Sequence, residues 1–186
     1  YNGSSQRIEF TLYSSGEVVS YDYTKAQYKY ENTVKDETLT THPTNAGIYD
    51  VTVIIPESTN YYSVTGQNTL EITKATAKFT TNPTINAFHQ GDTVTITGGV
   101  VKGINDTTIT TYGTLTSNSA SIIYNSTGKS ASNTYTATVT ITYTDYSGNY
   151  YNATTTVTAT MYAAAYIGTT FYGTIELALY TAANGT

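Results

Sequence analysis

Few residues of this chain are of the types that perform catalysis, which needs a base, a nucleophile or a metal held in a defined cleft. The two histidines, His42 and His89, both lie in sequence typical of loops, where a solvated histidine is the expectation. Asp36 and Glu37 are adjacent, so on a strand they would point to opposite faces and not act as a pair. The sequence holds no nucleophile elbow, calcium loop or phosphate-binding glycine loop. We therefore predict that the chain is not an enzyme, with no catalytic, metal-binding or cofactor-binding residues and no cofactor.

Tyrosine pairs are the residues with the clearest potential for binding. A tyrosine ring is amphipathic and can stack on a sugar ring. The candidate ligand-stacking residues are Tyr61, Tyr62, Tyr150 and Tyr151. Because side chains alternate along a strand, one member of each pair is expected to face the core.

Two further chemistries depend on lysine and threonine. A buried carboxylate can catalyse a Lys–Asn isopeptide crosslink in surface domains. Lys74 and Lys78 lie near a predicted domain junction, but the spacing does not single out a set of lysine, asparagine and carboxylate residues for this reaction.

Threonine ladders at 134–144 and 154–160 could order water, as in ice-binding proteins. We favour the simpler interpretation that threonine is a preferred exposed residue on a twisted strand.

The composition indicates a folded β protein. Charged residues make up 11% of the chain, against about 25% in typical domains. Aromatic and β-branched residues are abundant, which disordered chains lack. The absence of cysteine excludes disulfides and thiolate metal sites, and the net charge of −5 argues against nucleic acid as a partner. No apolar run approaches the ~20 residues of a membrane helix, so we expect no membrane insertion in this segment.

Hydrophobic and polar residues alternate in several short segments, the pattern of half-buried strands. In the first half of the chain these segments are 7–13, 18–23, 47–55 and 69–74, with a turn at 14–16. Pro56 ends the third segment because proline lacks the N–H that a strand ladder needs.

The second half contains the most regular pattern. A strand is predicted at 92–97, and alternation over 134–144 and 151–162 predicts a long hairpin. Its odd-numbered side chains from Tyr135 to Tyr143 share one face, and threonines share the other. Apolar residues at helical spacing behind Thr174, a candidate N-cap, predict a short C-terminal helix.

Four pieces of the first 75 residues together resemble a known repeat. Tyr1 to Gln6 fit a Tyr-x-Gly-x-x-Gln opening, and the other pieces are 43–53, 60–62 and 70–75. In this order they resemble the MBG family of mostly bacterial immunoglobulin-like domains, found in tandem on large surface proteins. The resemblance implies a β-sandwich and an extracellular location at the bacterial surface. In this context Gly47 would allow a turn into its strand, and Tyr49 would form a tyrosine corner.

These observations predict an all-β chain of two tandem immunoglobulin-like β-sandwich domains. Residues 1–75 form the MBG-like domain, 76–165 a second sandwich, and 166–186 the start of a truncated following module with a short helix. The predicted function is a non-catalytic structural or adhesive stalk of a bacterial cell-surface or secreted protein. The alternative is a carbohydrate- or protein-binding module, either independent or accessory to a polysaccharide-acting enzyme. The expected partners are neighbouring modules of the same chain and a host or cell-wall glycan or protein.

Overall fold

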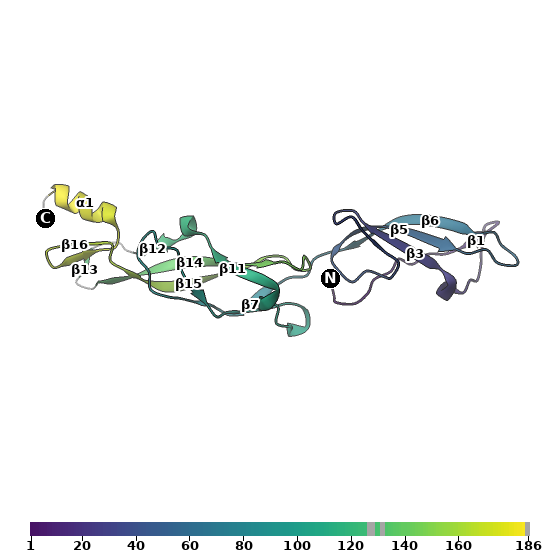
Figure 1. The fold of residues 1–186 in the computed structure, drawn as a ribbon, viewed down its shortest axis with the longest axis horizontal. Coiled ribbons are helices and arrows are strands. Elements are labelled where there is room, and N and C mark those ends of the chain that lie inside the picture. Colours follow the sequence, from purple (N-terminus) through teal and green to yellow (C-terminus); the bar gives the residue numbers. More distant parts are fainter. Residues whose placement is uncertain (126–128, 131–132, 185–186) are drawn as a thin grey trace. The chain divides into compact units, whose positions relative to one another are not determined.

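The computed structural model describes residues 1–125, 129–130 and 133–184, and they form a mostly β chain (Figure 1). The chain divides into two compact units, each with its own hydrophobic core. Unit 1 comprises Tyr1–Ala75 and Gly148–Tyr150, and unit 2 comprises Thr76–Ser147 and Tyr151–Thr186. The prediction of an all-β, sandwich-like fold with one short C-terminal helix is confirmed.

Unit 1 is built on one antiparallel sheet with the strand order β4-β3-β5-β6, beside a small separate hairpin. Its elements are β1 (Tyr13–Ser14), β2 (Glu17–Val18), the 3-10 helix η1 (Tyr23–Lys25), β3 (Gln27–Asn32), β4 (Glu37–Leu39), β5 (Gly47–Ile55) and β6 (Val64–Ile72). β5 ends at Ile55, directly before Pro56, as predicted, and the turn between β1 and β2 has Gly16 in the left-handed region at φ 88°.

The core of unit 1 lies on one face of this sheet. Tyr49, Val51, Val53 and Ile55 alternate along β5 and are buried, as the period of two predicts. The second layer is the N-terminal segment, whose Ile8, Phe10 and Leu12 pack on this core. The prediction of a strand over 7–13 is therefore right about which side chains face inward and wrong about the backbone, since only Tyr13–Ser14 forms a strand.

The middle of unit 1 contains two strands that the sequence patterns did not predict, β3 and β4. Along β3 the buried Tyr30 and Asn32 alternate with Lys29 and Glu31, which form an exposed ion pair at 2.7 Å. Of the strand predicted at 18–23, only Val18 forms part of a strand, at the end of β2, and Tyr23 belongs to η1.

Tyr49 forms the expected tyrosine corner. Its ring is buried, and its hydroxyl donates a hydrogen bond to the Asn45 carbonyl at 3.0 Å. Gly47 has a different role from the one predicted, because its backbone is not in the left-handed region. A Cβ at Gly47 would lie 2.9 Å from Asn32 Nδ2 and 3.3 Å from the Tyr49 ring, so glycine provides room for these two side chains.

Unit 2 contains the remaining elements. Its strands are β7 (Lys78–Thr81), β8 (Thr84–Ile85), β9 (Ile96–Thr97), β10 (Val100–Lys102), β11 (Gly113–Ser117), β12 (Ile123–Tyr124), β13 (Lys129–Ser130), β14 (Thr134–Asp145), β15 (Ala153–Tyr162), β16 (Ala165–Ile167) and β17 (Thr170–Tyr172). Its helices are η2 (Ile104–Asp106), η3 (Thr110–Tyr112), η4 (Ser119–Ser121) and α1 (Ile175–Asn184). Of the strand predicted at 92–97, only Ile96–Thr97 forms.

The predicted long hairpin forms as β14 and β15, and its buried face carries much of the core of unit 2. Ala137, Val139 and Ile141 on β14 are fully buried and pack with Phe88 and Met161. The threonines on the other face pair across the two strands, at 136 with 160, 138 with 158, 140 with 156 and 142 with 154.

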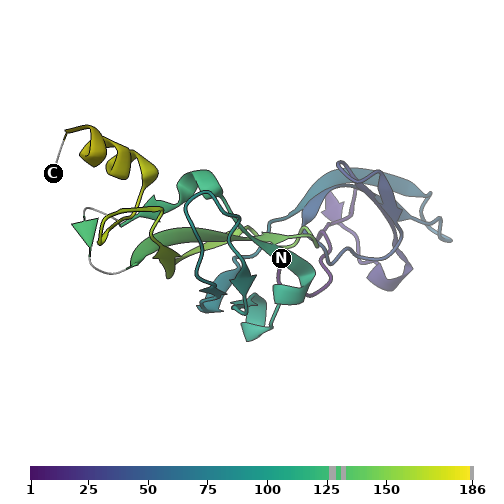
Figure 2. The same cartoon turned by 60° about the vertical axis from the view of Figure 1, so that its left-hand side comes forward.

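The predicted C-terminal helix is confirmed as α1. The Thr174 hydroxyl oxygen accepts a hydrogen bond from the Leu177 N–H at 3.2 Å, which satisfies one of the free N–H groups of the first turn. The helix packs against β16 and β17 (Figure 1 and Figure 2). The helix and these two strands belong to unit 2. Within the described ranges, no helix is both long and apolar enough to cross a membrane.

Candidate functional site

The four predicted stacking tyrosines differ in exposure. Tyr61 and Tyr62 are 51% and 90% exposed, and Tyr151 is 56% exposed. Tyr150 is only 7% exposed, and its ring packs edge-on against Tyr1 with the centroids 5.4 Å apart. One member of the second pair is thus buried, as alternation predicts, whereas both members of the first pair are exposed. Tyr150 has no exposed ring face for a ligand.

Tyr61 and Tyr62 are both exposed because they lie in a loop between strands β5 and β6. Pro56 ends β5, and the chain then closes a tight turn over residues 58–61. The Ser58 N–H donates to the Tyr61 carbonyl at 2.9 Å, and the Tyr61 N–H donates back to the Ser58 carbonyl at 3.4 Å. This turn projects the two rings from the end of the sheet, so the rule of strand alternation does not apply to them.

The tyrosine loop forms one wall of a cleft of about 1030 Å³. A second wall comes from the region of the β1–β2 hairpin and the chain that follows it, through residues 11–14, 19–22 and 25. Leu12, Val19 and Ile55 contribute apolar surface, and Tyr13 and Tyr21 bring further rings. This tyrosine cleft therefore combines segments that are far apart in the sequence.

The tyrosine cleft also contains polar groups that can hydrogen-bond to a ligand. These are the side chains of Asp22, Lys25, Glu57, Ser58, Thr59 and Asn60. Asp22 Oδ1 accepts hydrogen bonds from the Thr24 hydroxyl at 2.6 Å and the Thr24 N–H at 3.1 Å. These two bonds lower the pKa of Asp22 below its ordinary value of 3.8, so the carboxylate is ionised at neutral pH. Because both bonds go to Oδ1, Oδ2 is the oxygen available to a ligand.

The tyrosine cleft and the first residue of the chain lie at opposite ends of unit 1. In the β5–β6 ladder Gly47 pairs with Ile72 at one end, and Ile55 pairs with Val64 at the other. The Tyr1 amino group donates to the Thr73 carbonyl, so Tyr1 lies at the Gly47 end. The cleft is lined by Ile55 and Val64. At the rise of a β-strand the two ends are about 27 Å apart.

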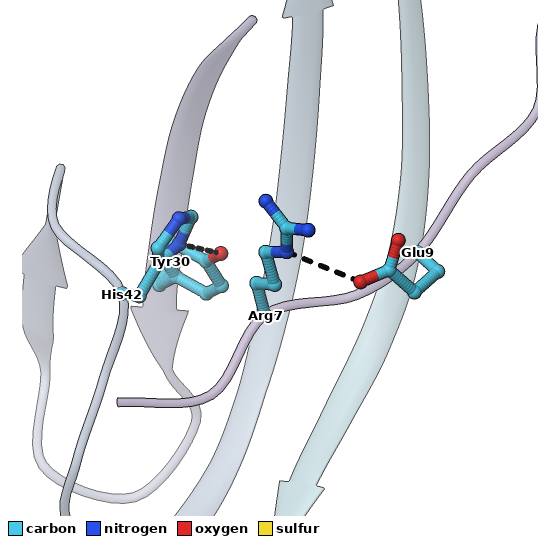
Figure 3. A network of polar contacts seen from close by, with 4 residues as sticks. All are labelled: Arg7, Glu9, Tyr30 and His42. Atoms are coloured by element: carbon cyan, nitrogen blue, oxygen red, sulfur yellow. Dashed lines mark hydrogen bonds and ion pairs between the residues drawn. The ribbon is translucent and has the colours of Figure 1, made fainter. Parts of the chain in front are cut away.

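A second polar cluster of unit 1 joins Tyr30 and His42 (Figure 3). Tyr30 is fully buried on β3, and its hydroxyl lies 2.6 Å from His42 Nδ1. The ring of Tyr28 packs edge-on against His42 with a centroid distance of 4.7 Å. Beside them, Arg7 forms an exposed ion pair with Glu9 at 3.1 Å. His42 lies in a loop, as expected, but it is only partly solvated, because its ring packs against Tyr28 and hydrogen-bonds to Tyr30.

The Tyr30–His42 pair is suited to holding structure and not to proton transfer at neutral pH. Burial lowers the pKa of His42 below 6.5, and the nearby positive charge of Arg7 adds to this effect. Burial also raises the pKa of Tyr30 to about 12, with a further contribution from Tyr28. Both groups are therefore neutral, and they share one hydrogen bond between the Tyr30 hydroxyl and His42 Nδ1. A hydroxyl that is fully buried also has no access to a substrate.

The other residues considered for chemistry lie apart from the tyrosine cleft. His89 is in a loop, as expected, with its Nδ1 3.4 Å from Asp92 Oδ2. Lys78 pairs with Asp106 at 3.7 Å, and both side chains are exposed, which does not fit a buried crosslink. In the part of the chain that the structure describes, no group of three or more histidine, aspartate or glutamate side chains is placed to hold a metal ion.

Comparison with known proteins does not assign the chain to a family. No protein-family model matches it, and no curated protein has a significant match to it. Function is therefore inferred from the fold and from the tyrosine cleft.

Proposed function

We propose that the chain is a non-catalytic structural and adhesive segment of a bacterial cell-surface or secreted protein, in which unit 1 presents a binding end. The supporting observation is that the tyrosine cleft and Tyr1 lie at opposite ends of unit 1. Tyr1 and Thr73 meet at the Gly47 end. Polypeptide that joins unit 1 at Tyr1 or follows Thr73 therefore does not need to cross the cleft, and the cleft stays accessible. This arrangement favours a unit that presents a ligand site over a unit that serves only as a spacer.

Several features support the extracellular and immunoglobulin-like parts of this proposal. Unit 1 has a tyrosine corner at Tyr49, a feature of immunoglobulin-like sandwiches, and its sequence resembles the MBG repeat. The chain has few charged residues and no cysteine, as bacterial surface domains often do. The β14–β15 ladder of unit 2 is long and continuous, which suits a structural role.

An adhesion assay tests this function. The chain is attached to beads through its C-terminus, and the beads are washed over surfaces coated with neutral polysaccharides, anionic polysaccharides or purified extracellular-matrix proteins. We expect retention on at least one of these surfaces. We expect the double variant Tyr61→Ala/Tyr62→Ala to lose that retention. The matched control is Tyr180→Ala, which removes an equally accessible tyrosine from α1 of unit 2.

Two results would contradict the proposal. One is retention no higher than that of uncoated beads on every surface. The other is equal retention of the wild-type chain and the double variant, which would mean that the tyrosine cleft does not mediate adhesion. Loss of retention in the Tyr180→Ala control would also count against a site on unit 1.

A further inference from the structure

The rings of the tyrosine cleft come from two separate segments of unit 1. Tyr13 and Tyr21 belong to the β1–β2 wall, and Tyr61 and Tyr62 to the loop after β5. Tyr13, Tyr61 and Tyr62 are all mostly exposed, although aromatic rings gain most from burial. A tyrosine ring has few rotatable bonds, so it offers a large contact surface at a small entropic cost. Such a cluster is suited to a ligand with flat, partly apolar faces.

The floor and the rim of the tyrosine cleft have complementary chemistry. The less exposed lining residues Leu12, Val19 and Ile55 give an apolar floor, whereas the exposed Asp22 and Asn60 offer carboxylate and amide groups at the rim. A pyranose ring has the matching pattern, because its C–H groups form an apolar face and its hydroxyls lie around the edge. Each hydroxyl both donates and accepts, so it can pair with a carboxylate or an amide.

The charges in the tyrosine cleft argue against strongly charged ligands. Asp22 and Glu57 are acidic and Lys25 is basic, which gives the lining a net charge of −1. Phosphorylated, sulfated or uronate-rich ligands would meet net repulsion, because they call for clustered arginine or lysine. A single excess carboxylate is also too little to select a cation. The favoured ligand is therefore uncharged.

The size of the tyrosine cleft indicates more than one sugar residue. Its volume of about 1030 Å³ is slightly above the roughly 300–1,000 Å³ typical of small-molecule sites. The rings on its two walls would contact successive residues of a chain. We propose that the tyrosine cleft of unit 1 binds a neutral oligosaccharide, with the rings of Tyr61 and Tyr62 stacking on its sugar faces. This inference rests on the proposed adhesive function and names its ligand class.

A titration of the intact chain tests the inference. Neutral tetrasaccharides of glucose, mannose and galactose are added separately to the isotope-labelled chain, with tetragalacturonate as the anionic comparison, and amide signals are followed by NMR. We expect saturable shifts with at least one neutral sugar, confined to residues 11–25 and 55–64. Replacing either Tyr61 or Tyr62 by alanine should weaken binding about tenfold, the effect of losing one aromatic contact. Tyr62→Phe should retain most of the affinity, and Tyr180→Ala all of it.

The outcomes separate this inference from the adhesive function. Failure of every neutral tetrasaccharide to bind overturns the inference, and tetragalacturonate binding as tightly as the best neutral sugar does the same. If the beads still adhere to protein-coated surfaces through Tyr61 and Tyr62, the adhesive function remains and the ligand is a protein. If neither sugar binding nor adhesion occurs, both proposals fail. Unchanged amide spectra of the variants outside the tyrosine cleft show that the fold is intact.

Discussion

The hydrogen bond between Tyr30 and His42 gives a quantitative prediction for unit 1. Tyr30→Phe removes the hydroxyl that lies 2.6 Å from His42 Nδ1 and keeps the ring that fills the core. A hydrogen bond of this kind contributes about 0.5–1.5 kcal/mol to stability. His42 is only partly buried, so water can reach its ring and the full penalty for an unpaired group does not apply. We expect Tyr30→Phe to lower the free energy of unfolding of unit 1 by about 1 kcal/mol.

The same pair predicts how the stability of unit 1 changes with pH. The pKa of His42 is below its ordinary value of 6.5, chiefly through burial and secondly through Arg7. Below pH 6.5 the unfolded chain therefore binds more protons than the folded chain, and the free energy of unfolding decreases. The stability linked to His42 is fully present above pH 6.5 and is lost as the pH falls toward the folded-state pKa. Arg7→Gln removes the nearby positive charge, so it should raise the His42 pKa and make this loss smaller.

Two measurements on the intact chain check these expectations. The imidazole C–H signals of the two histidines are titrated by NMR, and the variant His89→Asn identifies the signal of His89. Urea unfolding at pH 7.5 and 5.5, read from amide signals of unit 1, gives the stability of the wild type, Tyr30→Phe and His42→Asn. The reasoning would be refuted if His42 titrated at or above pH 6.5. It would also be refuted if Tyr30→Phe were as stable as the wild type, or if His42→Asn lost as much stability on acidification.

Further predictions concern backbone packing and a buried hydroxyl. Tyr49→Phe removes the hydrogen bond to the Asn45 carbonyl, and urea unfolding should show a loss of about 1 kcal/mol in unit 1; no loss would mean that water replaces the bond. Gly113→Ala places a Cβ against the Thr144 carbonyl in unit 2, so we expect a large loss of thermal stability or failure to fold. The control Gly66→Ala meets open space on β6 and should be neutral or stabilising by about 0.5 kcal/mol. Equal effects of the two glycine variants in thermal unfolding would contradict the packing at Gly113.

The parts of the fold that the sequence predicted are those determined by local alternation. The β14–β15 hairpin follows from a strict period of two, because each buried residue from Ala137 to Tyr143 is separated from the next by one threonine. The helix α1 follows from its spacing and from Thr174 as its cap. Alternation alone does not show whether the backbone is paired. Residues 7–13 alternate because they cover the sheet as a second layer, and most of this segment is not a strand.

The candidate site depends on contacts between distant segments, which the sequence did not indicate. Tyr61 and Tyr62 were identifiable from their type, but strand alternation predicted that one would be buried. The wall formed by Tyr13 and Tyr21 comes from a hairpin whose position over the loop depends on the tertiary packing of unit 1. The packing of the loop residue His42 could not be predicted, because its partner Tyr30 lies on β3, a strand that the patterns missed.

The threonine pairs across β14 and β15 have a consequence for the environments that unit 2 tolerates. Between Thr136 and Thr142 and between Thr154 and Thr160, this sheet face carries hydroxyl groups and no charged side chain. Dissolved ions weaken exposed ion pairs by screening, but they have little effect on packing between neutral side chains. The contribution of this hairpin to the stability of unit 2 should therefore be nearly the same in fresh water and in brine.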